Sequence, residues 1–267
     1  MSNLIEQKIE NGTGNTNIAQ QNNYNGVSIE QAMQICFDLF YKNFPKLQEE
    51  AQETAKKYLQ DNCKEIINNI IIKKNIDFYE FTRPDCQYSL EKILIHQALY
   101  NEREKNKLLS DLLINKLSSD FNSDKQINII MDRSIELSTQ LSLKQIDLLS
   151  VICISKNVKF ETDKKFTNES FVKYFNEFLN DFNFGENFNY NDIGYLLSLG
   201  CLQISYSNVL EGFCSNYSVE MEYINKNLSK TFLDMPNYAL TPVAIPIAIS
   251  NINNKKNKEF EFKQLLL

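Results

Sequence analysis

The sequence predicts a mainly α-helical fold, in which a helical array precedes an α+β region with a small β hairpin. Two observations support this prediction. Apolar residues recur at close to the 3.6-residue helical period over most of residues 28–152. Beyond residue 190, short segments that alternate apolar and polar residues, as strands do, stand between helix-like segments.

Composition limits the class of protein. The 267-residue chain is 43% hydrophobic, enough to bury a substantial core in one large domain or two small ones. Its formal net charge of -6 argues against a general electrostatic grip on nucleic acid or on an anionic membrane. The longest apolar run, Tyr238 to Ile249, is interrupted by two prolines and is shorter than the ~20 residues that a membrane-spanning helix needs. The first residues lack the pattern of a secretory signal, so we expect a cytoplasmic protein without a membrane segment.

The cysteines do not form a recognisable framework. Buried free thiols in a reducing compartment explain their wide spacing, without a Cys-x-x-Cys pair, better than disulfides or a zinc site do. We therefore expect no metal and no cofactor. The six residues are Cys36, Cys63, Cys86, Cys153, Cys201 and Cys214.

Residues 1–27 form an Asn/Gly-rich arm whose composition differs from that of the rest of the chain. Its central part, from residue 15 to residue 25, has neither charge nor proline, which suits the stacking of β strands with amide ladders between chains. A second interpretation stays open, in which the arm is a floppy tail whose asparagines reflect an AT-rich genome. The candidate interaction residues are Asn15, Asn17, Ile18, Gln20, Gln21, Asn22, Asn23, Tyr24 and Asn25.

A helical domain is expected over residues 28–141. It begins at Ser28, which has capping-box spacing to Gln31. The helical pattern then extends to Ile72, but Pro45 removes a backbone donor, so a break or kink is expected near Asn43. If continuous, this helix would be about 65 Å long, so its first half is expected to project from the body.

Four further helices follow in this domain and at the start of the next, and one of them is expected over Leu108 to Ile114. Thr82 is expected to cap a helix that runs to about Tyr100. Ser123 with Gln126, and Ser142 with Gln145, repeat the capping-box spacing ahead of apolar runs. The apolar face of the first of these helices reads Leu90, Ile93, Leu94 and Ala98, with Ile95 and Leu99 widening it.

The region expected over residues 142–252 changes character. Thr167 opens a helix, and a short helix after Asn191 is stopped by Gly200. Pro246 is expected to kink the closing apolar helix after one turn, and residues 253–267 are expected to form a charged tail. Strand-like runs stand at Cys201 to Tyr206, Tyr217 to Ile224 and Lys230 to Leu233.

This order of elements resembles a winged helix, on the strength of Leu199-Gly-Cys-Leu202 and Tyr238-Ala-Leu-Thr-Pro242. A winged helix often implies DNA binding through its recognition helix. Here Asn191 to Leu202 contains no Lys or Arg and includes the acidic Asp192, whereas helices that read DNA grooves carry basic or amide groups. A protein-interaction or structural use of the region is therefore favoured, and nucleic acid is not the expected partner.

No catalytic constellation is recognisable. His96, the only histidine, has no cysteine or carboxylate at ligand spacing, so a packed or surface role is favoured over a catalytic one. Glu91, Asp111 and Asp147 lie in expected helices without a base, metal ligand or phosphate loop beside them, and helical surface charge is their default interpretation. We therefore expect a protein that is not an enzyme.

A family resemblance rests on these segments: Asn15-Thr-Asn-Ile18, Gly26-Val-Ser28, Arg83-Pro-Asp-Cys-Gln-Tyr-Ser-Leu90, Leu108-Leu-Ser-Asp-Leu-Leu113 and the Leu-Gly-Cys and Leu-Thr-Pro segments. Together they resemble a small family of uncharacterised bacterial proteins, for which no activity, cofactor or catalytic residue can be carried over. The arm is also similar to short amyloid-like signalling motifs of some bacterial immune-type proteins. We therefore expect an intracellular homo-oligomer that assembles with itself or a protein partner through the arm; a DNA-associated winged-helix regulator is the alternative.

Overall fold

A computed structural model describes residues 28–43, 49–73, 76, 78–118, 124–157, 167–182, 190–205, 219–228 and 237–256. The arm, with its candidate interaction residues 15–25, lies outside this set. The elements are α1 (Ile29–Asn43), α2 (Glu49–Lys73), the 3-10 helix η1 (Phe78–Thr82), α3 (Pro84–Tyr100), α4 (Arg103–Leu117), α6 (Lys125–Gln140), α7 (Leu143–Asn157), α8 (Asn168–Asn180), α9 (Tyr190–Ser198), β1 (Leu202–Ile204), α11 (Met221–Asn227), β2 (Tyr238–Leu240) and α13 (Ala244–Lys256). The prediction of a mainly helical fold with a small antiparallel sheet is confirmed.

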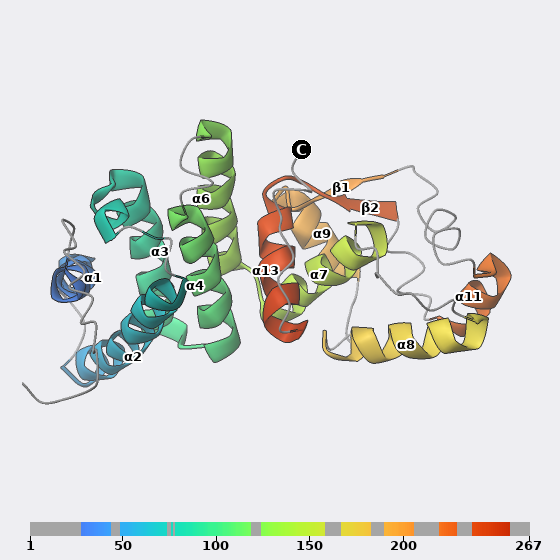
Figure 1. Cartoon of the computed structure of the whole chain (residues 1–267), viewed down its shortest axis with the longest axis horizontal. Coiled ribbons are helices and arrows are strands. Elements are labelled where there is room, and N and C mark those ends of the chain that lie inside the picture. The colour runs from blue at the N-terminus through green and yellow to red at the C-terminus, as the bar shows by residue number, and fades with distance from the viewer. Residues whose placement is uncertain are drawn as a thin grey trace, which may run out of the picture.

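Helix α13 joins the two parts of the molecule. Figure 1 shows α1 to α6 on one side and α7 to α11 with the two strands on the other, with α13 between them. This helix packs against α7 as well as against α4 and α6. The buried apolar side chains form one continuous cluster that extends from Ala32 to Ile252. The C-terminal helix therefore completes a core that both parts share.

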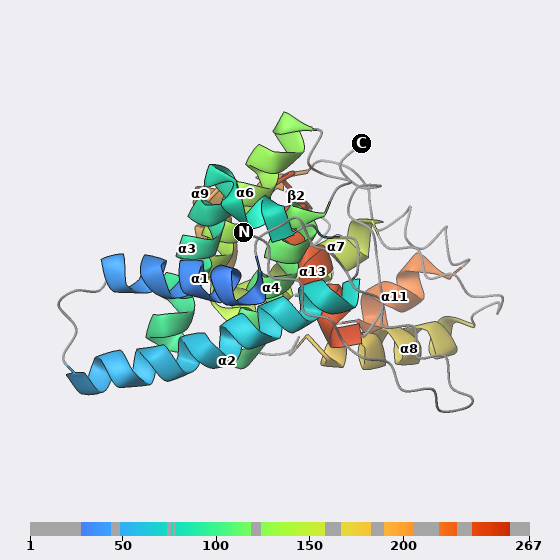
Figure 2. The ribbon, with the colours of Figure 1, turned by 60° about the vertical axis from the view of Figure 1, so that its left-hand side comes forward.

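The N-terminal helices begin and break as their sequence predicts. Ser28 and Gln31 form the capping box, in which the Ser28 N–H donates to Gln31 Oε1 at 2.8 Å and the Gln31 N–H donates to Ser28 Oγ at 3.2 Å. The expected break separates α1 from α2. The expectation that the first half projects is wrong, because α1 lies beside α2 (Figure 2) and packs on α2 and α3 through the buried Ala32 and Cys36.

Two predicted helix starts need correction. The N-cap of α3 is Arg83 rather than Thr82, whose hydroxyl donates to the Tyr79 carbonyl at 2.7 Å. The N-cap of α6 is Asp124, whose carboxylate accepts from two backbone N–H groups of the first turn. Aspartate caps a helix start about as well as serine does, so local preference does not decide which of two neighbouring residues is the N-cap. The predicted box at Ser142 and Gln145 is confirmed, with both reciprocal bonds present at the start of α7.

The apolar face predicted for α3 is correct except at its end. Leu90, Ile93, Leu94 and Ala98 are buried, whereas Leu99 is 53% exposed. Leu99 is the last residue but one of α3, and both it and the final residue Tyr100 are exposed. The buried apolar face of α3 is therefore narrower than predicted.

The two segments that suggested a winged helix pair with each other. They are Leu199-Gly-Cys-Leu202 and Tyr238-Ala-Leu-Thr-Pro242. Strands β1 and β2 are antiparallel, with Leu202 opposite Leu240, and both leucines are buried. Thr241 extends the pairing, since its N–H donates to the Cys201 carbonyl at 3.0 Å and its hydroxyl donates to the Gly200 carbonyl at 2.6 Å. Segments some forty residues apart in sequence thus meet at the end of α9.

The strand predicted at Tyr217 to Ile224 is wrong, because Met221–Asn227 forms helix α11. Val219, Ile224 and Leu228 are the buried positions, a spacing that suits one face of a helix and its flanks better than a strand. The Glu220 N–H donates to Asn168 Oδ1 at 3.0 Å, which fixes the start of α11 on α8. Residues 230–233, predicted as a third strand, lie outside the described residues.

The kink expected at Pro246 after one turn of the closing helix is wrong, because no complete turn precedes this residue. It is the third residue of α13, where a backbone N–H would lack an intrahelical partner in any case, so proline costs little there. The helix continues to Lys256, past residue 253 where the sequence suggested a tail. No helix among the described residues is both long and apolar enough to cross a membrane.

We predict that Gly200→Ala and Gly194→Ala shift stability in opposite directions. Gly200 has φ +72° in the turn that ends α9, where the Cys201 N–H donates to the Leu196 carbonyl and the Gly200 N–H to the Leu197 carbonyl. A Cβ there meets no atom within 4 Å, so the expected loss of about 1–2 kcal/mol comes from the left-handed backbone alone. Gly194 lies inside α9 with equal space, and alanine there should gain up to about 1 kcal/mol.

Urea unfolding of the two variants measures this difference. Equal effects of the two substitutions would contradict the assignment of Gly200 as the residue that needs the left-handed conformation.

Candidate functional site

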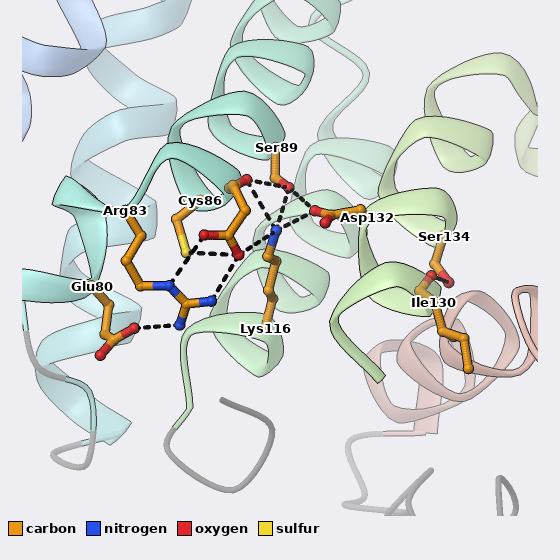
Figure 3. Close-up of polar contacts among 9 residues, drawn as sticks. Glu80, Arg83, Cys86, Ser89, Lys116, Ile130, Asp132 and Ser134 are labelled. Carbon is orange, nitrogen blue, oxygen red and sulfur yellow. Dashed lines mark hydrogen bonds and ion pairs between the residues drawn. The ribbon is translucent and has the colours of Figure 1, made fainter. Parts of the chain in front are cut away.

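A buried lysine ties three helices together. Lys116 lies in the last turn of α4 and its side chain is fully buried. Its ammonium group faces Asp85 of α3. Figure 3 shows that it also faces Ser89 of α3 and Asp132 of α6. We call Glu80, Arg83, Asp85, Ser89, Lys116 and Asp132 the Lys116 cluster.

Every N–H of the Lys116 ammonium has an acceptor. It donates to the Asp85 carbonyl at 3.0 Å, to Ser89 Oγ at 3.0 Å and to Asp132 Oδ1. The Asp85 carboxylate lies 3.3 Å from the same nitrogen. The Ser89 hydroxyl in turn donates to Asp132 Oδ1 at 2.5 Å. An ammonium has three hydrogens, so the hydrogen-bonding capacity of Lys116 is fully used.

Arg83 continues the cluster towards the surface. Its guanidinium holds Asp85 with two bonds, Nε to Oδ1 at 3.1 Å and Nη2 to Oδ2 at 2.7 Å. The remaining Nη1 donates to Glu80 Oε2 of η1 at 2.6 Å. This forked geometry is the strong form of an arginine–carboxylate pair. Asp85 therefore connects the partly exposed Arg83–Glu80 pair to the buried Lys116.

Partial burial raises the pKa of the Asp85 carboxyl, but the hydrogen bond from Arg83 and the charge of Lys116 outweigh it, so the pKa lies below its usual value. Two cations and three carboxylates leave the cluster with one net negative charge. Asp132 and Asp85 are partly exposed, at 28% and 35%, so water shares the hydration of their charge. Lys116 is the one charged side chain of the cluster that is removed from solvent.

This arrangement is suited to holding helices rather than to covalent chemistry. The nearby Cys86 thiol is buried, and burial together with the Asp85 charge raises its pKa to about 11, so it stays protonated at neutral pH. A protonated thiol is a poor nucleophile. Lys116 has no N–H left to donate to a substrate. The cluster is a polar tie between α3, α4 and α6.

Sequence reasoning named Arg83 to Leu90 only as a family segment and missed Lys116 and Asp132. A signal for Lys116 is present in the sequence, since it stands three and four residues after Leu113 and Leu112, on the apolar face of its helix. A lysine on such a face needs a buried partner. Nothing in the local sequence identifies Asp132 as that partner, because the pairing joins residues from different helices.

His96 is a buried residue of α3, 5% exposed, as its packed interpretation predicts. Its ring centroid lies 5.0 Å from that of Tyr100. Burial, and then the charge of Lys105, lower the pKa of His96 to about 4. Within the described part of the chain its Nε2 has no hydrogen-bond partner.

The other singled-out residues have separate positions. The interpretation of Asp147 as helical surface charge is wrong, since it is 2% exposed on α7 and accepts from Asn251 and Lys255 of α13. Glu91 and Asp111 are half-buried. No three His, Cys, Asp or Glu side chains of the described segments are placed to hold one metal ion.

The cysteine prediction is confirmed for the five cysteines that the structure describes, which are buried and free, while Cys214 lies outside the described residues. A hydrogen bond with Cys63 of α2, and then burial, raise the pKa of Cys36 on α1.

We predict that Lys116→Met destabilises the protein by about 2–4 kcal/mol, because Asp85 and Asp132 lose their buried cation. Their partial exposure keeps the cost below that of a fully buried carboxylate pair. The matched control is Lys125→Met, at an exposed position in the first turn of α6, for which a change within about 0.5 kcal/mol is expected. Urea unfolding with unchanged m-values checks both, and a Lys116→Met loss no larger than the control's would contradict a structural role.

We predict that His96 makes the protein less stable as the pH falls from about 6.5 to 4. The folded-state pKa is about 4, below the ordinary value of 6.5, so the unfolded chain binds a proton first and stability is lost on acidification. The extra loss relative to His96→Leu should be on the order of 2–3 kcal/mol across this window. Parallel curves of unfolding free energy against pH for the two proteins would show that His96 does not titrate in this way.

Comparison with known proteins identifies the chain by family. A protein-family model whose description reads ":-like" matches residues 26–234. The match begins at Gly26 and includes every residue of the Lys116 cluster. No curated protein and no solved structure matches the chain. Because the matched residues make up most of the sequence, the chain belongs to the family that this model describes.

Proposed function

We propose that this chain is a non-enzymatic intracellular protein that assembles with itself or with a protein partner, in bacterial defence or signalling. The arm from Asn15 to Asn25 is the adhesive segment, and the helical body is the scaffold that presents it. The absence of charge and proline from this segment favours pairing between arms of different chains.

The attachment of the arm supports this proposal. Ser28 is held by its reciprocal bonds to Gln31, and α1 is anchored through buried residues on α2 and α3. The arm therefore starts from a fixed point on a packed helix. A fixed start reduces the conformational freedom that is lost when the arm pairs with another chain.

The side chains exposed on α9 favour a protein partner over DNA. We propose that α9, β1, β2 and α13 form a winged-helix-like region in which α9 occupies the place of a recognition helix. Its exposed positions are uncharged and include Tyr190 and Tyr195, 68% and 41% exposed. Its acidic Asp192 is held by Lys144 of α7 at 2.7 Å. Tyrosines on a helix that has no Lys or Arg of its own suit a protein surface rather than phosphates.

The alternative, a DNA-associated regulator, rests on the order of elements around the β1–β2 pair. Fluorescence anisotropy with labelled duplex DNA separates the two. We expect no salt-sensitive binding, because groove-reading proteins gain affinity from Lys and Arg contacts to phosphate. Binding that weakens steeply with added salt would favour the alternative.

We predict that Ile18→Lys with Tyr24→Lys lowers the oligomeric state of the full chain, because like charges would repel between stacked arms. Size-exclusion chromatography with light scattering measures the mass. The matched control is Ile5→Lys with Ile9→Lys, which adds the same charge outside the uncharged segment and should leave the mass unchanged. Equal masses for the wild type and both variants would remove the arm as the assembly element.

A further inference from the structure

Two cysteine side chains meet where α1 lies beside α2. Cys36 stands in the middle of α1 and Cys63 near the middle of α2, and Figure 2 shows the two helices side by side. The two thiols form a hydrogen bond with each other. They are buried, 5% and 1% exposed, and both are free. Because a thiol–thiol hydrogen bond runs from sulfur to sulfur, the two atoms that a disulfide would join are already in contact.

Small side chains let the two helices approach closely at this point. Among the side chains of α1 that the structure describes, Ala32 and Cys36 are the buried ones. They stand four residues apart, about one turn from each other on the same face of the helix. A disulfide between neighbouring helices needs Cα atoms about 4.4–6.8 Å apart. An alanine and a cysteine at the contact favour such a short separation, whereas larger side chains would hold the helices further apart.

Access to the thiols depends on movement of α1. This helix buries fewer of its described side chains than α2 does. A helix with few buried contacts opens locally at a lower free-energy cost than the core does. In the closed arrangement the hydrogen bond with Cys63, and then burial, raise the pKa of Cys36, so its thiol stays protonated and reacts slowly. Movement of α1 away from α2 exposes this thiol to solvent, so oxidation proceeds through such opening.

We propose that Cys36 and Cys63 form a reversible disulfide, which locks α1 onto α2 when the protein meets a small-molecule disulfide such as oxidised glutathione. The Cys36 thiolate attacks one sulfur of the glutathione disulfide, forms a mixed disulfide and releases one glutathione thiolate. The Cys63 thiolate then attacks the Cys36 sulfur and releases the second glutathione thiolate. The two protons lost by the protein thiols protonate the two glutathione thiolates. Two protein thiols are thereby oxidised, and one glutathione disulfide is reduced.

The disulfide changes the N-terminal part of the body in two ways. It closes a loop between residues 36 and 63, which restricts the unfolded chain and so stabilises the folded one. It also prevents α1 from moving away from α2. Because α1 begins directly after Ser28, oxidation fixes the helix from which the arm starts. The lock itself acts within one chain and is independent of whether the arm joins chains.

Peptide mass spectrometry of the full chain under non-reducing conditions tests the linkage. After treatment with oxidised glutathione, a cross-linked pair of peptides that contain Cys36 and Cys63 is expected, and dithiothreitol should separate the pair. Cys63→Ser should instead keep glutathione on Cys36, because the thiol that displaces it is missing. The matched control is Cys201→Ser, which removes a buried free cysteine of the other part of the molecule and should form the same cross-link as the wild type.

Thermal unfolding measures the lock. Oxidation should raise the unfolding midpoint of the wild type and of Cys201→Ser by about 4–7 °C, and it should not raise that of Cys36→Ser. Absence of the cross-link, at an oxidant concentration that modifies the thiols of the urea-unfolded chain, would overturn the proposal. A cross-link of either cysteine to a different one, or an unchanged midpoint in the cross-linked protein, would overturn it as well.

Discussion

Lys116 places a positive charge inside the helical body, and the positions of three helices depend on how that charge is satisfied. Removing an ammonium from water is costly unless acceptors replace its hydration. Those acceptors come from the first turns of α3 and the middle of α6, so neither helix can shift without leaving the charge unpaired. Apolar packing tolerates small displacements more readily than this directional set of bonds does.

The packing of the other helices follows from the positions of α3, α4 and α6. With α3, α4 and α6 fixed, α4 and α6 present the surface on which α13 packs, α13 in turn packs on α7, and α7 contacts β2 of the strand pair. Ser134 of α6 reinforces this contact by donating to the Val243 carbonyl at 2.7 Å, just before α13 begins. Among the described residues, α13 thus supplies the main contact between the C-terminal region and the N-terminal helices.

Features set by neighbouring residues were predictable, and features set by distant pairing were not. The boxes at Ser28 and Ser142, the left-handed Gly200 and the break after α1 all follow from local geometry. The partners of Lys116 and the folding back of α1 depend on tertiary contacts that local sequence does not encode.

Local rules also failed where two of them competed. Strand-like alternation around Val219 coincided with a helical face, and burial of Ile224 and Leu228 against the core selected the helix. Pro246 disrupts a helix interior but not a first turn, so its effect depended on a boundary that the sequence left unspecified.

The candidate sites divide in the same way. The arm stands out by composition alone, whereas the Lys116 cluster brings together residues from Glu80 to Asp132 whose pairing has no local signature. Asp147 illustrates the difference: it resembles surface charge in sequence and becomes a buried acceptor for Asn251 and Lys255 of α13 in the fold.

A double-mutant cycle between Lys116 and Asp132 tests most directly whether this buried tie organises the body. Unfolding free energies of Lys116→Met, Asp132→Asn and the double variant give the coupling energy. Direct pairing across α4 and α6 predicts a coupling of about 1–3 kcal/mol, with the double variant less destabilised than the sum of the single ones. Additive effects, with a coupling below about 0.5 kcal/mol, would contradict the account.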